Sequence, residues 1–197
     1  SVMFVYLDQI KSVNDSRGHM AGDRLLTQVA RRIQGLVRET DLVARLGGDE
    51  FAIILPNDCN VESVGGLADR LIEETRRAYL VDDDQINIGV SIGIAMAPMN
   101  GTRPDQILRN ADLALYRAKA DGRSVYRFFE SQMDSEARER RLLEVELRDA
   151  INNNELVLYY QPLVAAEDGR PTGFEALVRW NHPIRGLVAP AEFIPVA

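Results

Sequence analysis

Residues 45–51, Arg-Leu-Gly-Gly-Asp-Glu-Phe, lie between two short apolar segments at 42–46 and 51–55. These segments have the length and composition of β-strands, so the residues between them predict the loop of a β-hairpin. Two consecutive glycines allow a positive φ and a close approach to a ligand, whereas two adjacent carboxylates repel each other. This composition fits a site for a metal ion and phosphate groups. An ordinary solvated turn is the alternative interpretation.

Strands and amphipathic helices alternate on both sides of the predicted hairpin. Apolar or alternating runs predict the strands, and apolar residues spaced i, i+3, i+4, i+7 predict the helices. The predicted strands cover residues 2–7, 86–97 and 124–129, and the predicted helices cover 25–37, 61–79 and 104–121. This order predicts an α/β fold, an α+β sandwich in which helices flank a mixed central sheet and the hairpin protrudes.

Two further features of this part of the chain are informative. The chain opens abruptly on a strand, which predicts that part of the domain lies before Ser1. Asp82-Asp83-Asp84 predicts a solvated turn, because it lacks the alternating acidic pattern and the distal Glu of a calcium loop.

Composition and charge restrict the classes of partner. The 197 residues, 46% hydrophobic and 27% charged, have room for one large domain or two small ones. No apolar run approaches the roughly 18 residues of a membrane span, and no signal peptide is evident, so we expect a cytoplasmic location, either free or attached to a membrane. A net charge of -7 argues against a nucleic acid partner. A few cations or a divalent metal ion would still create a small anion site.

The composition changes near residue 130. Residues 135–151 predict a strongly charged helix with one apolar stripe, and two strands follow at 156–164 and 172–180, separated by a turn at Gly169. We therefore expect a first domain at 1–129, a connecting helix at 130–152 and an incomplete second domain at 153–197.

Four segments, in order, resemble the GGDEF domains of diguanylate cyclases. They are Gly47-Gly48-Asp49-Glu50-Phe51, the upstream segment 7–23 (Leu-Asp-Gln-Ile-Lys-Ser-Val-Asn-Asp-Ser-Arg-Gly-His-Met-Ala-Gly-Asp), Ser91-Ile-Gly-Ile94, and residues 110–123 with the pattern Asn-Ala-Asp-x-Ala-x-Tyr-x-Ala-Lys-x-x-Gly-Arg. The resemblance implies a nucleotidyl-cyclase-like fold and an activity that joins two GTP molecules into cyclic di-GMP, a bacterial second messenger of signal transduction. Because the reaction needs two facing domains, it also implies a homodimer, at least transiently.

The second domain resembles the opening of an EAL domain, the cyclic di-GMP phosphodiesterase barrel. The matching segments are 156–164 (Leu-Val-Leu-Tyr-Tyr-Gln-Pro-Leu-Val), 173–180 (Gly-Phe-Glu-Ala-Leu-Val-Arg-Trp) and 190–195 (Pro-x-x-Phe-Ile-Pro). A complete barrel of this type needs about 250 residues, so we expect only a helix and two strands that begin a truncated barrel. Glu175 matches the metal-ligating Glu of the family and Arg179 its phosphate-facing Arg, on one face of a strand.

The resemblance also implies a set of site residues. Asp49 and Glu50 would be the catalytic and metal-binding carboxylates, with Mg²⁺ or Mn²⁺ as the cofactor. Asn14 and Asp23 would hydrogen-bond guanine, and the remaining GTP-binding residues would be Lys11, Gly47, Gly48, Lys119 and Arg123. The residues alone allow other interpretations: a helix-dipole role for Lys119 and Arg123, a turn or cap at Asn14-Asp15, and a solvated helical face for Asp23.

Tyr6 departs from the family pattern. It occupies the position of the first-strand Asp, a metal ligand in the family, and a neutral phenol is a poor ligand for a hard cation. Asp8 lies on the same face of the strand and is an alternative carboxylate that could compensate, but it is displaced by about 7 Å. We therefore expect weak metal binding and weak or absent cyclase activity. Alternative functions are a silent GTP- or cyclic di-GMP-binding domain that regulates the attached EAL domain, and a plain dimerisation module.

Arg38 and Asp41 form an Arg-x-x-Asp pattern just before the hairpin. It resembles the inhibitory cyclic di-GMP site of the family, where Arg38 would bind phosphate or guanine. An ion pair at the end of a helix is the alternative. The remaining expected partners are the rest of the EAL domain and an upstream sensor domain.

Overall fold

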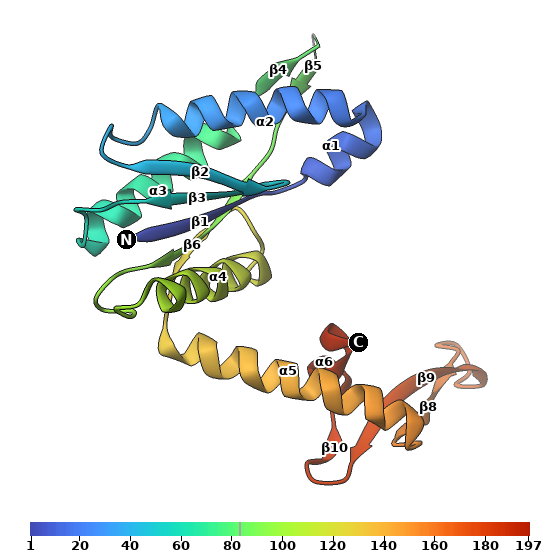
Figure 1. The fold of residues 1–197 in the computed structure, drawn as a ribbon. Helices are drawn as coiled ribbons and strands as arrows, with labels where there is room; N and C mark the ends of the chain where they lie inside the picture. The colour runs from blue at the N-terminus through green and yellow to red at the C-terminus, as the bar shows by residue number, and fades with distance from the viewer. Residues whose placement is uncertain (83) are drawn as a thin grey trace. The chain divides into compact units, whose positions relative to one another are not determined.

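The computed structural model describes residues 1–82 and 84–197, which divide into two compact units, Ser1–Asp134 and Ser135–Ala197 (Figure 1). The predicted turn residue Asp83 lies outside the described residues. None of the helices in the described ranges is long and apolar enough to cross a membrane.

The first unit is built on a five-stranded sheet of order β2-β3-β1-β6-β7. Its central strand, β1, pairs antiparallel with both β3 and β6, whereas β7 pairs parallel with β6. The predicted mixed sheet is therefore confirmed, with the hairpin of β2 and β3 along one edge. The strands are β1 (Val2–Leu7), β2 (Leu42–Gly47), β3 (Glu50–Ile54), β6 (Val90–Ala95) and β7 (Tyr126–Phe128).

Helices cover both faces of this sheet because β1 alternates buried side chains between them. Met3, Val5 and Leu7 belong to the main core, which also contains the apolar stripes of two long helices. Val2 and Phe4 point to the opposite face and pack with a further helix. The helices are α1 (Ile10–Arg17), α2 (His19–Gln34) and α3 (Val61–Arg76), with α4 (Pro104–Ala120) on the second face.

The contact between β6 and α4 is close. A Cβ atom built on Gly93 would lie 2.1 Å from the backbone nitrogen of Leu115 and 2.2 Å from the carbonyl oxygen of Ala111. The small residues in the predicted strand 86–97 therefore let the helix backbone approach the sheet. This contact fixes α4 against the strand that pairs with β1.

Residues 77–89 differ from the prediction. The helix expected to reach Tyr79 ends at Arg76, and the single strand expected at 86–97 is divided. A two-stranded ribbon of β4 (Tyr79–Val81) and β5 (Asp84–Ile86) precedes β6. Tyr79 and Ile86 are buried and continue the apolar patterns of their neighbours, so the periodicity conceals both boundaries.

The second unit has its own small core. Part of the long helix α5 (Ser131–Asn152) packs its apolar stripe against an open antiparallel sheet of order β10-β9-β8. Trp180 is fully buried, and its indole N–H donates to a Glu155 carboxylate oxygen at 3.0 Å. The remaining elements are β8 (Leu156–Val164), β9 (Pro171–His182), β10 (Gly186–Val188), α6 (Pro190–Phe193) and a 3₁₀ turn (Ile194–Val196). The short strand β10 is additional to the two predicted strands.

We predict that Gly93→Ala destabilises the first unit by roughly 2–4 kcal/mol, because a methyl group would meet backbone atoms that cannot move independently. Gly66→Ala is the matched control, since a Cβ at this exposed helical position meets nothing within 4 Å and should stabilise by up to about 1 kcal/mol. Urea unfolding followed by circular dichroism measures both. Equal stability of the two variants would contradict the close packing.

Candidate nucleotide site

The conformation of the hairpin tip is fixed by hydrogen bonds from Arg45, a side chain of the hairpin itself. Gly47 pairs with Glu50 across the turn, and Gly48 adopts a left-handed conformation with φ of 52°. The Arg45 guanidinium donates from Nε and Nη2 to the carbonyl oxygen of Gly48, at 3.0 and 2.8 Å. The Asp49 carbonyl oxygen accepts from the Leu7 N–H at 3.0 Å, so the tip is also tied to β1. The sequence did not predict this role of Arg45. The available signal was the position of an arginine two residues before the glycine pair, within reach of the turn.

Strand β1 brings Tyr6 beside this tip. Tyr6 lies opposite Glu50 in the ladder with β3. Burial raises the pKa of the Tyr6 phenol above 10.0, as do a hydrogen bond to the Asp49 carboxylate and the charges of Asp49 and Asp8, against a lowering by Arg123. The phenol is therefore neutral at pH 7. The expected metal-ligand position therefore carries an uncharged side chain beside the Asp49 carboxylate.

A lysine stands over the same ring. The Lys119 Nζ atom, in the last turn of α4, lies 3.4 Å from the centroid of the Tyr6 ring, a cation–π contact. Arg123 follows in the next turn with φ of 63°, and its N–H donates to the Ala118 carbonyl oxygen. The structure thus brings Lys119 and Arg123 to the side of β1 that carries Tyr6. A helix-dipole role for Lys119 is compatible with this position, but its ammonium group has a specific neighbour.

Asp8 is committed to a buried network. Its side chain is 3% exposed and accepts from Ser91 Oγ at 3.0 Å and from the Ser124 N–H and Oγ at 3.2 Å each. A Cβ at Gly89 would lie 2.1 Å from Ser124 Oγ, so the surroundings are closely packed. The Asp8 carboxylate is therefore already engaged by donors from β6 and from the turn after α4. A polar residue within the apolar run 86–97, Ser91, was the sequence signal for this network.

The predicted guanine-binding residues lie where α1 meets α2. Asn14 is inside α1, so the alternative of a turn or cap is wrong. Its Oδ1 atom is buried, lies 1.9 Å from a Cβ built on Gly22, and has no hydrogen-bond partner among the described residues. Asp23 is the next residue of α2 and is exposed, as is Lys11 on α1. An unpaired acceptor next to an exposed carboxylate can receive the N–H donors of a base.

Arg38 and Asp41 do not form the ion pair proposed as the alternative. The Asp41 carboxylate accepts from the backbone N–H of Arg38 at 2.9 Å. The Arg38 guanidinium, 71% exposed, extends toward the Asp58 carboxylate at 3.9 Å. A hydrogen bond from Ser63 holds the pKa of Asp58 below its usual value, with contributions from the Asn60 N–H and the Arg38 charge. The Arg38 guanidinium is thus accessible to a ligand, and an anionic ligand would compete with the Asp58 carboxylate for it.

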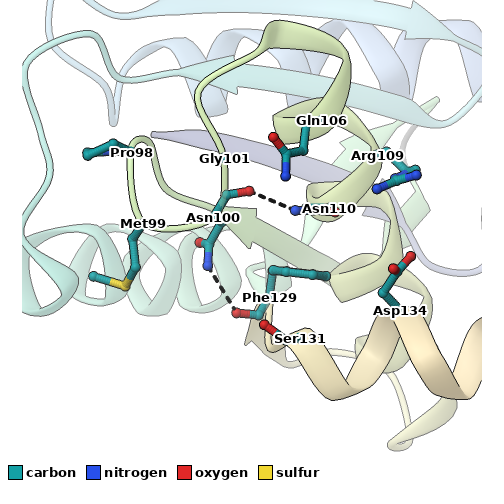
Figure 2. A pocket seen from close by; sticks show the side chains of 10 residues that line it. All are labelled: Pro98, Met99, Asn100, Gly101, Gln106, Arg109, Asn110, Phe129, Ser131 and Asp134. Carbon is teal, nitrogen blue, oxygen red and sulfur yellow. Dashed lines mark hydrogen bonds between the residues drawn. The ribbon is translucent and has the colours of Figure 1, made fainter.

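A separate cavity of about 360 Å³ lies at the first turns of α4 (Figure 2). The Asn110 amide donates to the Asn100 carbonyl oxygen at 2.7 Å, and the Asn100 amide donates to the Phe129 carbonyl oxygen at 3.5 Å. None of the predicted site residues lines this cavity. Its hydrogen bonds fix the loop that leads into α4, and it is distinct from the candidate nucleotide site.

Glu175 and Arg179 lie on β9 of the second unit. Glu175 is exposed and pairs in register with Gln161, while Arg179 lies opposite Val157 and donates to the Val178 carbonyl oxygen at 2.8 Å. Their spacing puts them on one face of the strand. Their roles in an EAL site stay a prediction.

The residues at the hairpin do not fit a divalent cation. The hairpin tip itself supplies the carboxylates Asp49 and Glu50, position 6 supplies a neutral phenol, and a positively charged ammonium group lies over the Tyr6 ring. Within residues 1–82 and 84–197, no group of three or more His, Cys, Asp or Glu side chains gathers as metal ligands would. Anionic oxygens are what Mg²⁺ requires.

A mixed central sheet flanked by helices, with a glycine-rich acidic hairpin along one edge, is the fold expected of a nucleotidyl-cyclase-like domain. A family model described as "Diguanylate cyclase, GGDEF domain" matches residues 1–125, and one described as "EAL domain" matches residues 144–197. The chain therefore belongs to the GGDEF family and continues into an EAL domain. The resemblance inferred from the four sequence segments is confirmed.

Known relatives agree with this assignment. The bifunctional diguanylate cyclase/cyclic di-GMP phosphodiesterase MucR of Pseudomonas aeruginosa is 43% identical over 197 residues, which is 100% of this chain and 29% of that protein. The GGDEF domain of YfiN (TpbB) from the same organism superposes with a TM-score of 0.64 at 39% identity, covering 66% of this chain and 81% of that one.

A further solved structure is the GGDEF domain of DgcB from Caulobacter crescentus in complex with c-di-GMP. It has a TM-score of 0.59 at 28% identity, over 64% of this chain and 75% of that one. The chain thus covers most of a GGDEF domain but under a third of a curated relative such as MucR.

We predict that Asp8→Ala lowers the free energy of unfolding by about 2–4 kcal/mol, because the Ser91 hydroxyl and the Ser124 N–H would lose their buried acceptor. The control is Asp15→Ala, an exposed position on α1 that should change stability by less than about 0.5 kcal/mol. Urea unfolding curves measure both. If Asp8→Ala were as mild as Asp15→Ala, the buried network would not be stabilising.

Proposed function

We propose that this GGDEF domain of a GGDEF–EAL protein in cyclic di-GMP signalling binds GTP but forms cyclic di-GMP weakly or not at all. In this role it is a nucleotide-binding regulatory domain for the attached EAL domain. The observation that carries the proposal is Tyr6, a neutral phenol beside the Asp49 carboxylate at the position of a family metal ligand. We further propose that residues 1–129 form the GGDEF domain, 130–152 the connecting helix and 153–197 the start of the EAL domain.

Removing a metal ligand should reduce catalysis more than it reduces GTP binding. In phosphoryl and nucleotidyl transfer, divalent cations neutralise the phosphates and help to activate the attacking hydroxyl. A phenol in place of a carboxylate removes one anionic ligand from such a site. The groups that would recognise the base, Asn14 and Asp23, lie on α1 and α2 and do not depend on Tyr6.

A weakly active diguanylate cyclase is the second candidate. The observation that favours it is the intact Gly47–Phe51 tip, closed by Arg45 and tied to β1. Any such activity would need two GTP molecules on facing domains, so a homodimer, at least a transient one, belongs to this candidate. Mg²⁺ or Mn²⁺ would be its weakly bound cofactor.

We predict that the wild-type chain gives little or no cyclic di-GMP from GTP in Mg²⁺ or Mn²⁺, and that Tyr6→Asp raises the rate by about tenfold or more, because it restores an anionic ligand. Product is measured by chromatography. Asp49→Ala added to Tyr6→Asp should remove the gain. Robust wild-type turnover that Asp49→Ala abolishes would overturn the proposal in favour of the active cyclase.

Cyclic di-GMP is the second proposed ligand, at Arg38 and Asp41. The exposed Arg38 guanidinium can donate two parallel hydrogen bonds to phosphate or to the guanine edge. The backbone bond from Arg38 to Asp41 fixes the turn that carries both residues.

We predict that Arg38→Ala weakens cyclic di-GMP binding by about tenfold or more, since it removes a charge-assisted contact. Isothermal titration calorimetry measures the affinity. Arg31→Ala is the control, because this residue is exposed on α2 but precedes the turn. Unchanged affinity in Arg38→Ala would exclude this site.

A further inference from the structure

We propose that the Lys119 ammonium group, held over the Tyr6 ring, takes the place of the divalent cation, so that the domain binds the triphosphate of GTP without a metal ion. This inference rests on the proposed GTP-binding function and specifies how the site achieves it. Its consequence is regulatory, because occupancy would then follow the GTP concentration and not the supply of metal ion.

The first argument is geometric. Tyr6 is directly opposite Glu50 across the β1–β3 ladder, and Lys119 Nζ is 3.4 Å from the Tyr6 ring centroid. The cation therefore stands at the residue that matches the family's metal ligand, next to the hairpin tip. It reaches this place from α4, which the close contact at Gly93 fixes on the sheet.

The second argument concerns the chemistry of the ring. A carboxylate at position 6 would form an ion pair with Lys119 and neutralise it. An aromatic ring attracts the ammonium group through its quadrupole and leaves the full positive charge in place. Because a cation–π contact at a partly exposed site is weaker than a charge-assisted hydrogen bond to phosphate, the ammonium group can exchange one for the other.

The third argument is the charge balance at the tip. The negative charges of Asp49 and Asp8 and the positive charge of Arg123 all act on the Tyr6 ring, and Lys119 lies over it. An Asp at position 6 would add a further negative charge to these carboxylates, and an anionic triphosphate would then need a metal ion to offset the repulsion. The neutral tyrosine avoids this additional charge.

Calorimetric titration of GTP into the intact chain, with Mg²⁺ and separately with EDTA, tests the inference. We expect the wild-type affinity to agree within about twofold in the two conditions. Tyr6→Asp should bind at least about tenfold more tightly with Mg²⁺ than with EDTA, because its extra carboxylate needs a cation. Tyr6→Phe, which keeps the ring, should remain independent of metal.

Lys119→Ala tests the cation directly and should weaken GTP binding in EDTA by about tenfold or more. Arg109→Ala is the matched control: it removes one charge from the same helix about 15 Å away along its axis, beyond the screening length in physiological salt. Circular dichroism checks that each variant is folded. Equal affinity of the two variants would overturn the role of Lys119.

The outcomes separate this inference from the proposed function. GTP binding that requires Mg²⁺ in the wild type would overturn metal independence and leave the GTP-binding function standing. No GTP binding in either condition would overturn both. Metal-independent binding that is lost in Lys119→Ala and kept in Arg109→Ala supports both.

Discussion

The antiparallel pairing of β1 with two neighbours is the constraint on which the rest of the structure depends. This six-residue strand fixes the hairpin on one side and β6 on the other, and its register puts Tyr6 opposite Glu50. Alternation along the strand divides its side chains between the main core and the α4 face. A shift of one residue would exchange these faces, turning Tyr6 into the core. The register of β1 therefore determines both the core and the site.

Much of this architecture could be predicted from the sequence, because each feature was expressed in local periodicity. The helical stripe around Leu25 and Val29 and the hairpin flanking Gly47 gave correct elements, and β6 lies within the longer strand predicted at 86–97. The β4–β5 ribbon could not be predicted, since Tyr79 and Ile86 continue the apolar patterns on either side. The helix α1 was also missed, because its eight residues are mostly polar and bury only Ile10 and Val13.

The candidate site shows a different limit. Motif spacing could name Tyr6, Asp49, Lys119 and Arg123 separately, but not that the lysine would stand over the tyrosine ring. That contact joins residues 113 positions apart, and no local pattern encodes it. The same holds for Asp8, because the groups that donate hydrogen bonds to its carboxylate, on Ser91 and Ser124, come from β6 and from the turn after α4. Roles that depend on such long-range contacts become visible only in the folded chain.

The two hydrogen bonds from Arg45 to the Gly48 carbonyl oxygen have a consequence for how the hairpin tolerates substitution. Because the tip takes its shape from bonds within the chain, that shape does not require a bound ion. On the proposed function, the substitution at position 6 removes a metal ligand without a large cost in folding, and the residues proposed to bind the base are unchanged. In that case a single change in the central strand is enough to separate nucleotide binding from catalysis.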